Sequence, residues 1–413
     1  MPMKAIADLR DVRDLVPHWR VEIRYLLMHL PPVRADRSPS VLPGGFDWEY
    51  LLATASQHGV LPLFVDSVSR QDRPAIPEVV LKRARRECSV VAQRNFIFAQ
   101  ELLRLIAHLH AHEVDVVPYK GASLAEMAYG DLSLRQFSDL DILVRSTDVL
   151  RARGLLEELG YRARFIYGRR PLTSLTAPET RNFLKYRHEF EMQREDGLLV
   201  DLHWQLAPRH YPFRLDPAPL WDRMESTVLA GRSIPSFARE DLILVLCMHG
   251  AKDSWEKLVW ILDLARIITN ARELDWDAIE RDARDARMEL PLLLGLRLVE
   301  SLCAVEIPSL SDRDPDSRID GLARSVFERL FREHREPERF PVKALHLGLC
   351  RNAGDRLSYT IQALFVPRLG EWAMLRLPAW AFPLYYVLRP LRILAGWSLS
   401  RIRRKIAAAG RRS

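Results

Sequence analysis

The spacing of apolar side chains separates a central region with strands from helical regions on both sides of it. Before about residue 95, segments such as "FDWEYLLATASQHGVLPLFVDSVSR" repeat apolar residues every three or four positions, which is the period of an amphipathic helix. Beyond about Pro208 this period returns, as in "EDLILVLCMHGAKDSWEKLVWILDLARIITNA". The pattern therefore predicts an N-terminal helical region over residues 1–95 and a C-terminal helical domain over residues 209–370.

Between these regions, from Val114 onward, the period changes to that of strands. Short apolar or alternating runs predict strands at "VDVVPY", "DLDILV", "YRARFIY", "RHEFEMQRE" and "LLVDLHWQL". Helices are predicted at "ASLAEMAYG" and "TDVLRARGLLEEL", and Asp196-Gly197 predicts a hairpin between the last two strands. Because crossover helices and a hairpin occur together, we predict an α+β protein whose mixed-sheet core, residues 96–208, is flanked by the two helical regions.

The composition is that of a folded protein with its positive charge at one end. A length of 413 residues predicts two or three domains. With 48% hydrophobic and 28% charged residues, the composition is that of an ordinary folded protein. Nine Lys and Arg residues follow Glu371, the last acidic residue, and they exceed the net charge of +7, so the first 371 residues are slightly acidic. This distribution argues against a body that binds nucleic acid. The four cysteines are far apart and share no metal-ligand spacing, so we expect reduced thiols. The first residues hold no apolar stretch of signal-peptide length, so we expect a cytoplasmic protein.

The basic aromatic tail, residues 371–413, allows two interpretations. It contains "LPAWAFPLYYVL" followed by "RPLRILAGWSLSRIRRK", and the apolar run is too short to span a bilayer. Aromatic residues beside clustered arginines are typical of a segment that lies on a membrane surface, here the inner face. A C-terminal helix packed on the body, with a solvated basic end, explains the pattern equally well.

Two acids begin an otherwise apolar strand. In "DLDILV", alternation places Asp139 and Asp141 on one face of the strand and its aliphatic residues on the other. Like charges on one face destabilise a strand, and a divalent cation removes that cost. In "LLVDLHWQL" the same alternation places Asp201 and His203 together. A solvated strand edge or a salt bridge to an arginine would explain these acids without a metal.

The order of Lys-Gly, Arg, Asp-x-Asp and Asp-x-His-Trp resembles a known family. "KGASLAEMAYGDLSLRQFSDLDILV", then "ARGLLEELGY" and "VDLHW", are similar to the uncharacterised nucleotidyltransferase family of the polymerase-beta-like superfamily. The flanking "FDWEYLLATASQHGVLPLF", "LCMHGAKDSWEKLVWILDLARII" and "PLYYVLRPLRIL" also resemble that family. The resemblance therefore covers most of the chain.

The resemblance implies roles for individual residues. Asp139 and Asp141 would hold the metal ions that bridge the nucleotide phosphates, and Asp201 would complete the site and help to activate the attacking hydroxyl. The nucleotide-binding residues would be Lys120, Gly121, Ser123, Arg135, His203, His249 and Lys252. Lys120-Gly121 stands where the superfamily has Gly-Ser, so Ser123 is the expected replacement for the missing hydroxyl. His249 and Lys252 would close over the phosphates from the helical domain, although a solvated helix end explains them equally well.

The implied activity is transfer of an NMP from an NTP, with ATP as the expected donor, to a hydroxyl group, with release of pyrophosphate. Two Mg²⁺ ions are expected, with Mn²⁺ as the other candidate metal. The family's occurrence in bacterial biosynthetic and export gene clusters suggests a small-molecule, glycan or peptide acceptor, while a protein or tRNA acceptor stays open. The alternatives are a non-catalytic, membrane-associated scaffold and a protein that binds nucleic acid through its basic tail.

Overall fold

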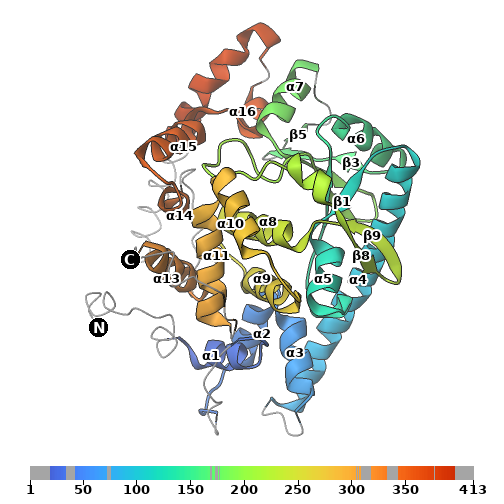
Figure 1. The fold of residues 1–413 in the computed structure, drawn as a ribbon, viewed down its shortest axis with the longest axis vertical. Coiled ribbons are helices and arrows are strands. Elements are labelled where there is room, and N and C mark those ends of the chain that lie inside the picture. Colours follow the sequence, from blue (N-terminus) through green and yellow to red (C-terminus); the bar gives the residue numbers. More distant parts are fainter. Residues whose placement is uncertain are drawn as a thin grey trace, which may run out of the picture.

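The fold is α+β, as the sequence predicts, with a mixed five-stranded sheet surrounded by helices (Figure 1). The computed structural model describes residues 19–33, 42–71, 76–167, 170–172, 175, 177–303, 305, 307, 318–332, 343–375 and 377–395. Within these ranges, no helix combines the length and the apolar content needed to cross a bilayer.

The sheet brings together strands that are far apart in the sequence. Its order is β1 (Val116–Pro118), β2 (Leu140–Val144), β7 (Leu199–His203), β6 (Glu189–Gln193) and β3 (Arg162–Ala163). Strands β2 and β7 are parallel, and the other neighbours are antiparallel. The predicted hairpin joins β6 to β7, where Gly197 has φ +90° and Arg194 N–H donates to the Leu198 carbonyl at 3.0 Å.

Two strand predictions are wrong in detail. "YRARFIY" is not one strand, because it divides into β3 and β4 (Phe165–Tyr167), and β4 pairs with β5 (Arg170–Leu172) in a separate ribbon. The region after Pro208 also contains a hairpin of β8 (Glu225–Leu229) and β9 (Arg232–Ser236), where only helices were expected. Its turn residues Ala230 and Gly231 both have positive φ, as a tight hairpin turn requires, and alanine at the first position gives little signal of such a turn.

The helical predictions before the sheet are confirmed. The helices are α1 (Val21–Met28), α2 (Trp48–Gln57), α3 (Leu61–Ser69) and α4 (Glu78–Ala111). The Asp47 carboxylate accepts a hydrogen bond from Tyr50 N–H and caps α2. Helix α4 is a single helix of 34 residues that ends at Ala111, with His112 as its C-cap.

The remaining helices lie within and after the core. Those between the strands are α5 (Gly121–Tyr129), η4 (Leu132–Leu134), α6 (Val149–Glu158) and α7 (Ala177–Tyr186), with η5 (Pro219–Arg223) before β8. Those after β9 are α8 (Arg239–Lys252), α9 (Leu258–Asn270), α10 (Trp276–Asp285), α11 (Glu289–Leu302), α13 (Arg318–Leu330), α14 (Ala344–Gly348), α15 (Ala353–Phe365), α16 (Leu369–Met374) and η6 (Ala379–Leu384). Residues 385–395 continue as a helix.

The sheet lies between two hydrophobic cores. One core contains Leu140 and Ile142 of β2 together with residues of α4 and α6. The other contains Leu143 of β2, helices α1 to α3, and helices α8, α9 and α11. The N-terminal and C-terminal helical regions therefore share one core, although the sequence predicts them as separate units; the domain boundaries themselves stay predictions.

Candidate active site

Strands β2 and β7 place two acids next to each other on the face of the sheet that meets the helical region. In their parallel register Asp141 is the direct partner of Asp201. Leu140, Ile142, Val200 and Leu202 point to the opposite side, where all four are buried. The strict alternation of side chains along a strand thus produces the polar face that the sequence predicts.

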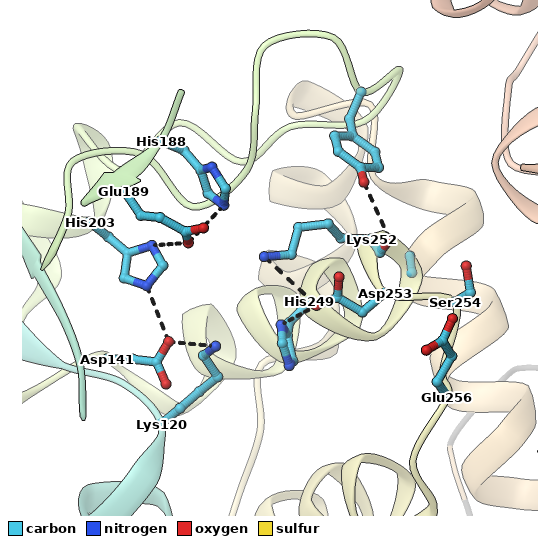
Figure 2. A network of polar contacts seen from close by, with 12 residues as sticks. Lys120, Asp141, His188, Glu189, His203, His249, Lys252, Asp253, Ser254 and Glu256 are labelled. Atoms are coloured by element: carbon cyan, nitrogen blue, oxygen red, sulfur yellow. Dashed lines mark hydrogen bonds and ion pairs between the residues drawn. The ribbon is translucent and has the colours of Figure 1, made fainter. Parts of the chain in front are cut away.

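A group of three side chains on this face could hold a metal ion. Asp141, Asp201 and His203 each offer a ligand atom, and these atoms all lie within 4.8 Å of one another. His203 is almost fully buried, with Nε2 3.1 Å from Asp141 Oδ1 and Nδ1 3.4 Å from Glu189 Oε2. His188, Glu189 and His203 form a second group with the same property. Figure 2 shows the three side chains of the second group pointing toward one another, with Asp141 beside them.

Asp139 stands just before β2 and is not part of either group. Burial, followed by the charge of Asp141, raises the pKa of the Asp139 carboxyl. The charges of Lys120 and Arg135 act in the opposite direction. Asp139 therefore interacts with the cluster through its charge.

Lys120 is the positive counterpart of Asp141. Its ammonium lies 2.7 Å from Asp141 Oδ1, and its side chain is only 12% exposed. Burial raises the pKa of the Asp141 carboxyl, but Lys120 and His203 outweigh it and hold that pKa far below its usual range. In this arrangement Lys120 shares Asp141 with any cation that binds beside it.

Among the described residues, no Lys or Arg side chain forms an ion pair with Asp201. Burial, followed by the charges of Asp141 and Glu189, raises its pKa from 3.8 to about 8. Retention of an uncompensated acid in a partly buried cluster costs stability. With all of its acids ionised, the cluster would carry more negative charge than its own cations neutralise, so Asp201 keeps its proton to high pH. A divalent cation would remove this cost of ionisation.

Gly121 brings the start of α5 against the acidic strand. Its φ is +58°, and a Cβ atom on this residue would lie 3.1 Å from the Asp139 carbonyl oxygen. Glycine is thus required for both the turn and the close approach. The N-terminal end of α5, where backbone N–H groups favour anions, consequently adjoins Asp139 and Lys120.

The end of α8 contributes positive groups from the helical region. His249 Nδ1 and Lys252 Nζ lie 3.2 Å and 3.7 Å from Asp253 Oδ2. Burial, then the charges of Lys120 and Lys252, hold the pKa of His249 well below its ordinary value. Figure 2 shows Lys252 extending from α8 toward the histidines and acids of the sheet. The structure thus brings His249 and Lys252 to the same site as Lys120.

Two predicted site residues, Arg135 and Ser123, form hydrogen bonds with groups other than the three acids. Arg135 donates hydrogen bonds to both oxygens of Asp263 on α9, at 2.9 to 3.1 Å, and both side chains are buried. Ser123 is 1% exposed, and its hydroxyl donates to the Lys120 carbonyl at 3.1 Å. Arg135 therefore joins the sheet region to α9, and Ser123 supports the turn that holds Lys120; their roles in nucleotide binding stay predictions.

The site also contains His188, Glu189 and Asp253, which no sequence motif indicates. Glu189 is the register partner of His203, and Glu191 that of Asp201. The observed register places three residues, 195–197, in the turn, because Arg194 N–H donates to the Leu198 carbonyl. A two-residue Asp196-Gly197 turn would pair Glu189 with Trp204 instead, so the sequence pattern alone does not give the contact of Glu189 with His203. Asp253 follows α8 and meets the site only through tertiary packing, for which the sequence holds no local signal.

A cavity of about 790 Å³ lies elsewhere, and none of the three acids lines it. Its lining includes Arg209, Tyr211 and Tyr359. The Tyr211 hydroxyl donates to the Lys252 carbonyl at 3.5 Å. The cavity is therefore distinct from the acidic cluster, and it adjoins the C-terminal end of α8, where Lys252 lies.

Comparison with known proteins gives one family match. The family described as "Uncharacterised nucleotidyltransferase" matches residues 44–304, more than half of the chain. No curated protein matches. Among solved structures, the chain is similar to an antigenic nucleotidyltransferase-like protein from Paracoccidioides brasiliensis, at 14% identity and a TM-score of 0.26, over 51% of this chain and 91% of that chain.

Proposed function

The chain belongs to the uncharacterised nucleotidyltransferase family and is a transferase, and from this premise we propose the reaction and its metals. The protein transfers an NMP from an NTP, with ATP as the expected donor, to a hydroxyl of an acceptor and releases pyrophosphate. The acceptor is a small molecule, glycan or peptide. Two divalent cations, Mg²⁺ or Mn²⁺, take part.

The observation that carries this proposal is the register of Asp141 and Asp201 on neighbouring parallel strands, where burial and the charge of Asp141 raise the pKa of the Asp201 carboxyl. Carboxylate oxygens are the ligands that Mg²⁺ prefers. They also suit Mn²⁺, and His203 in the same group offers a nitrogen as a further ligand atom. The donor set thus fits the metals that the resemblance implies.

In this proposal the chain's own residues position the reactants. Asp139, Asp141 and Asp201 hold the cations, which when bound neutralise charge on the phosphates and activate the hydroxyl. Lys120, with the N–H groups at the start of α5, contacts the triphosphate. Lys252 and His249 approach the same phosphates from α8. Positioning and charge neutralisation account for most of the catalysis of phosphoryl transfer, so no covalent nucleophile is needed.

A non-catalytic scaffold is the competing proposal. It requires no metal and tolerates loss of any acid. All three acids are present, and two of them meet in register with a histidine beside them, which supports the enzyme.

Label transfer from α-labelled NTP separates the two proposals. Purified protein is incubated with the labelled NTP, Mg²⁺ or Mn²⁺, and cell extract as the source of acceptor. We expect a labelled product with the wild type, and a loss of at least about a hundredfold with Asp141→Asn, because one cation loses its ligand. Asp277→Asn, a change of the same chemistry at an exposed position of α10, serves as the matched control and should label like the wild type. Equal labelling by wild type and Asp141→Asn would favour the scaffold.

A further inference from the structure

Exposed hydrophobic side chains gather at the C-terminal end of the described chain. Of sixteen large hydrophobic side chains that are exposed among the described residues, ten lie between Leu357 and Leu394. They are Leu357, Ile361, Phe365, Met374, Leu375, Trp380, Leu384, Val387, Leu391 and Leu394. Clustering of this kind marks an interaction surface, whereas scattered single residues do not.

Half of these side chains belong to one amphipathic helical segment, η6 and the helix over residues 385–395 that follows it. Leu384, Val387, Leu391 and Leu394 recur every three or four residues and are 52% to 61% exposed. Trp380, four residues before Leu384, is 84% exposed. These five residues form what we call the tail stripe. The segment is amphipathic, but its apolar stripe faces outward.

The opposite face of the segment is fixed to the body. Tyr385 is 1% exposed, belongs to the core of the sheet region, and donates to the Leu375 carbonyl at 2.7 Å. Arg389 is 2% exposed and donates to the Ala363 carbonyl of α15 at 2.7 Å and 3.2 Å. Arg389 and Arg392 also pair with Glu371. The tail stripe is consequently presented on an anchored helix, at the top of the view in Figure 1.

Helix α15 extends the apolar surface. Leu357, Ile361 and Phe365 recur every four residues and are 43% to 62% exposed, while Tyr359 and Ala363 on the other side are buried. The hydrogen bonds of Arg389 to Ala363 hold the two helices next to each other. Two adjoining helices therefore each expose an apolar stripe.

The charge of the neighbouring sequence indicates what covers the tail stripe. No acidic residue follows Glu371, and six Lys and Arg residues lie within residues 396–413, directly after the helix. A second copy of the chain would bring two clusters of the same sign together, which is unfavourable. An anionic lipid surface offers both the apolar layer for the stripe and the opposite charge for the basic residues.

We propose that the tail stripe is a peripheral membrane-binding surface that takes the surface of an anionic bilayer. The helix lies in the plane of the interface, with Trp380, Leu384, Val387 and Leu391 inserted, and the positive charge of the sequence that follows it favours anionic headgroups. This property is separate from nucleotidyl transfer, because the stripe contains none of the acids or lysines of the site.

Vesicle cosedimentation of the full chain tests the proposal. The vesicles consist of phosphatidylcholine alone or of phosphatidylcholine mixed with phosphatidylglycerol. We expect the wild type to sediment with the mixed vesicles, and much less with phosphatidylcholine alone or at high salt. The double substitution Leu384→Glu/Leu391→Glu should weaken binding at least about tenfold. Each change removes an apolar side chain that would insert into the bilayer, and adds a negative charge that the anionic lipid repels.

Val228→Glu, an equivalent change on an exposed strand residue of β8, is the matched control and should bind like the wild type. Circular dichroism melting of each variant confirms that it is folded. Trp380→Phe gives a second readout: a blue shift of tryptophan fluorescence on vesicle addition should be present in the wild type and reduced in this variant. Absent sedimentation of the wild type, sedimentation unchanged by the double substitution, or a wild-type dimer that the double substitution converts to a monomer overturns the proposal.

Discussion

Two buried acids, Asp263 and Asp201, lie in opposite electrostatic surroundings. Asp263 on α9 accepts hydrogen bonds from both Arg135 and the Tyr129 hydroxyl. Asp201 on β7 lies among Asp139, Asp141 and Glu189, and its pKa rises to about 8. The first acid is neutralised by the chain's own residues. The second is not, and this difference separates an ion pair that holds two regions together from a group of acids that suits a cation.

The largest expected effect comes from removing Arg135, the cationic partner of Asp263. Arg135→Met leaves Asp263 buried with no cationic partner, so the free energy of unfolding should fall by about 3–5 kcal/mol. Urea denaturation followed by circular dichroism measures this. The double variant Arg135→Met/Asp263→Leu should recover most of the loss, because no charge then remains buried. A single variant as stable as the wild type would contradict the structural role given to Arg135.

A smaller and opposite effect is expected at Asp201 in metal-free protein. The pKa of this carboxyl is about 8 in the folded chain and 3.8 in its unperturbed state, so between these pH values the folded state holds a proton that the unfolded state has lost. The stability contribution is therefore complete below about pH 4 and is lost as the pH rises through about 8.

Asp201→Asn removes this titration and should raise the melting temperature of metal-free protein at pH 8 by at least about 2 °C. The gain should disappear near pH 4. Thermal melts in the presence of a chelator, across this pH range, make the comparison; a wild type and variant with parallel pH profiles would show that Asp201 carries no uncompensated charge.

The smallest effect is expected from Glu189→Gln. The charge of Glu189 is one of the causes of the raised pKa of Asp201, after burial and Asp141. Removal of this charge should lower the pKa of Asp201 in the variant. The pH-dependent loss of stability should then end at a lower pH in the variant than in the wild type, without being abolished. The same thermal melts measure this shift, and an upward shift would contradict the arrangement of charges.

The sequence predicts the acidic face well because strand alternation is local. Asp139, Asp141 and Asp201 could be placed on polar faces from the pattern alone, and the parallel register that joins Asp141 to Asp201 agrees with that prediction. Gly121 was also identified, although the close approach of its backbone to the Asp139 carbonyl is visible only in the structure.

Contacts between distant segments could not be predicted in this way. Arg135 and Asp263 are 128 residues apart, and no spacing rule connects them, so their ion pair could not be predicted. The role of Arg135 in nucleotide binding stays a prediction. The sequence of the tail also left its tertiary contacts undetermined. Its pattern allows both a packed helix and a membrane surface, and the structure shows one face packed and the other exposed.

The central claim is that Asp139, Asp141 and Asp201 together hold divalent cations. Titration of the full chain with Mn²⁺, followed by the electron paramagnetic resonance signal of the free ion, tests it without a known acceptor. The account predicts saturable binding that Asp141→Asn and Asp201→Asn each weaken at least about tenfold, while Asp277→Asn binds like the wild type. Binding of equal affinity in all four proteins, or no binding by the wild type in the presence of an NTP, would contradict the account.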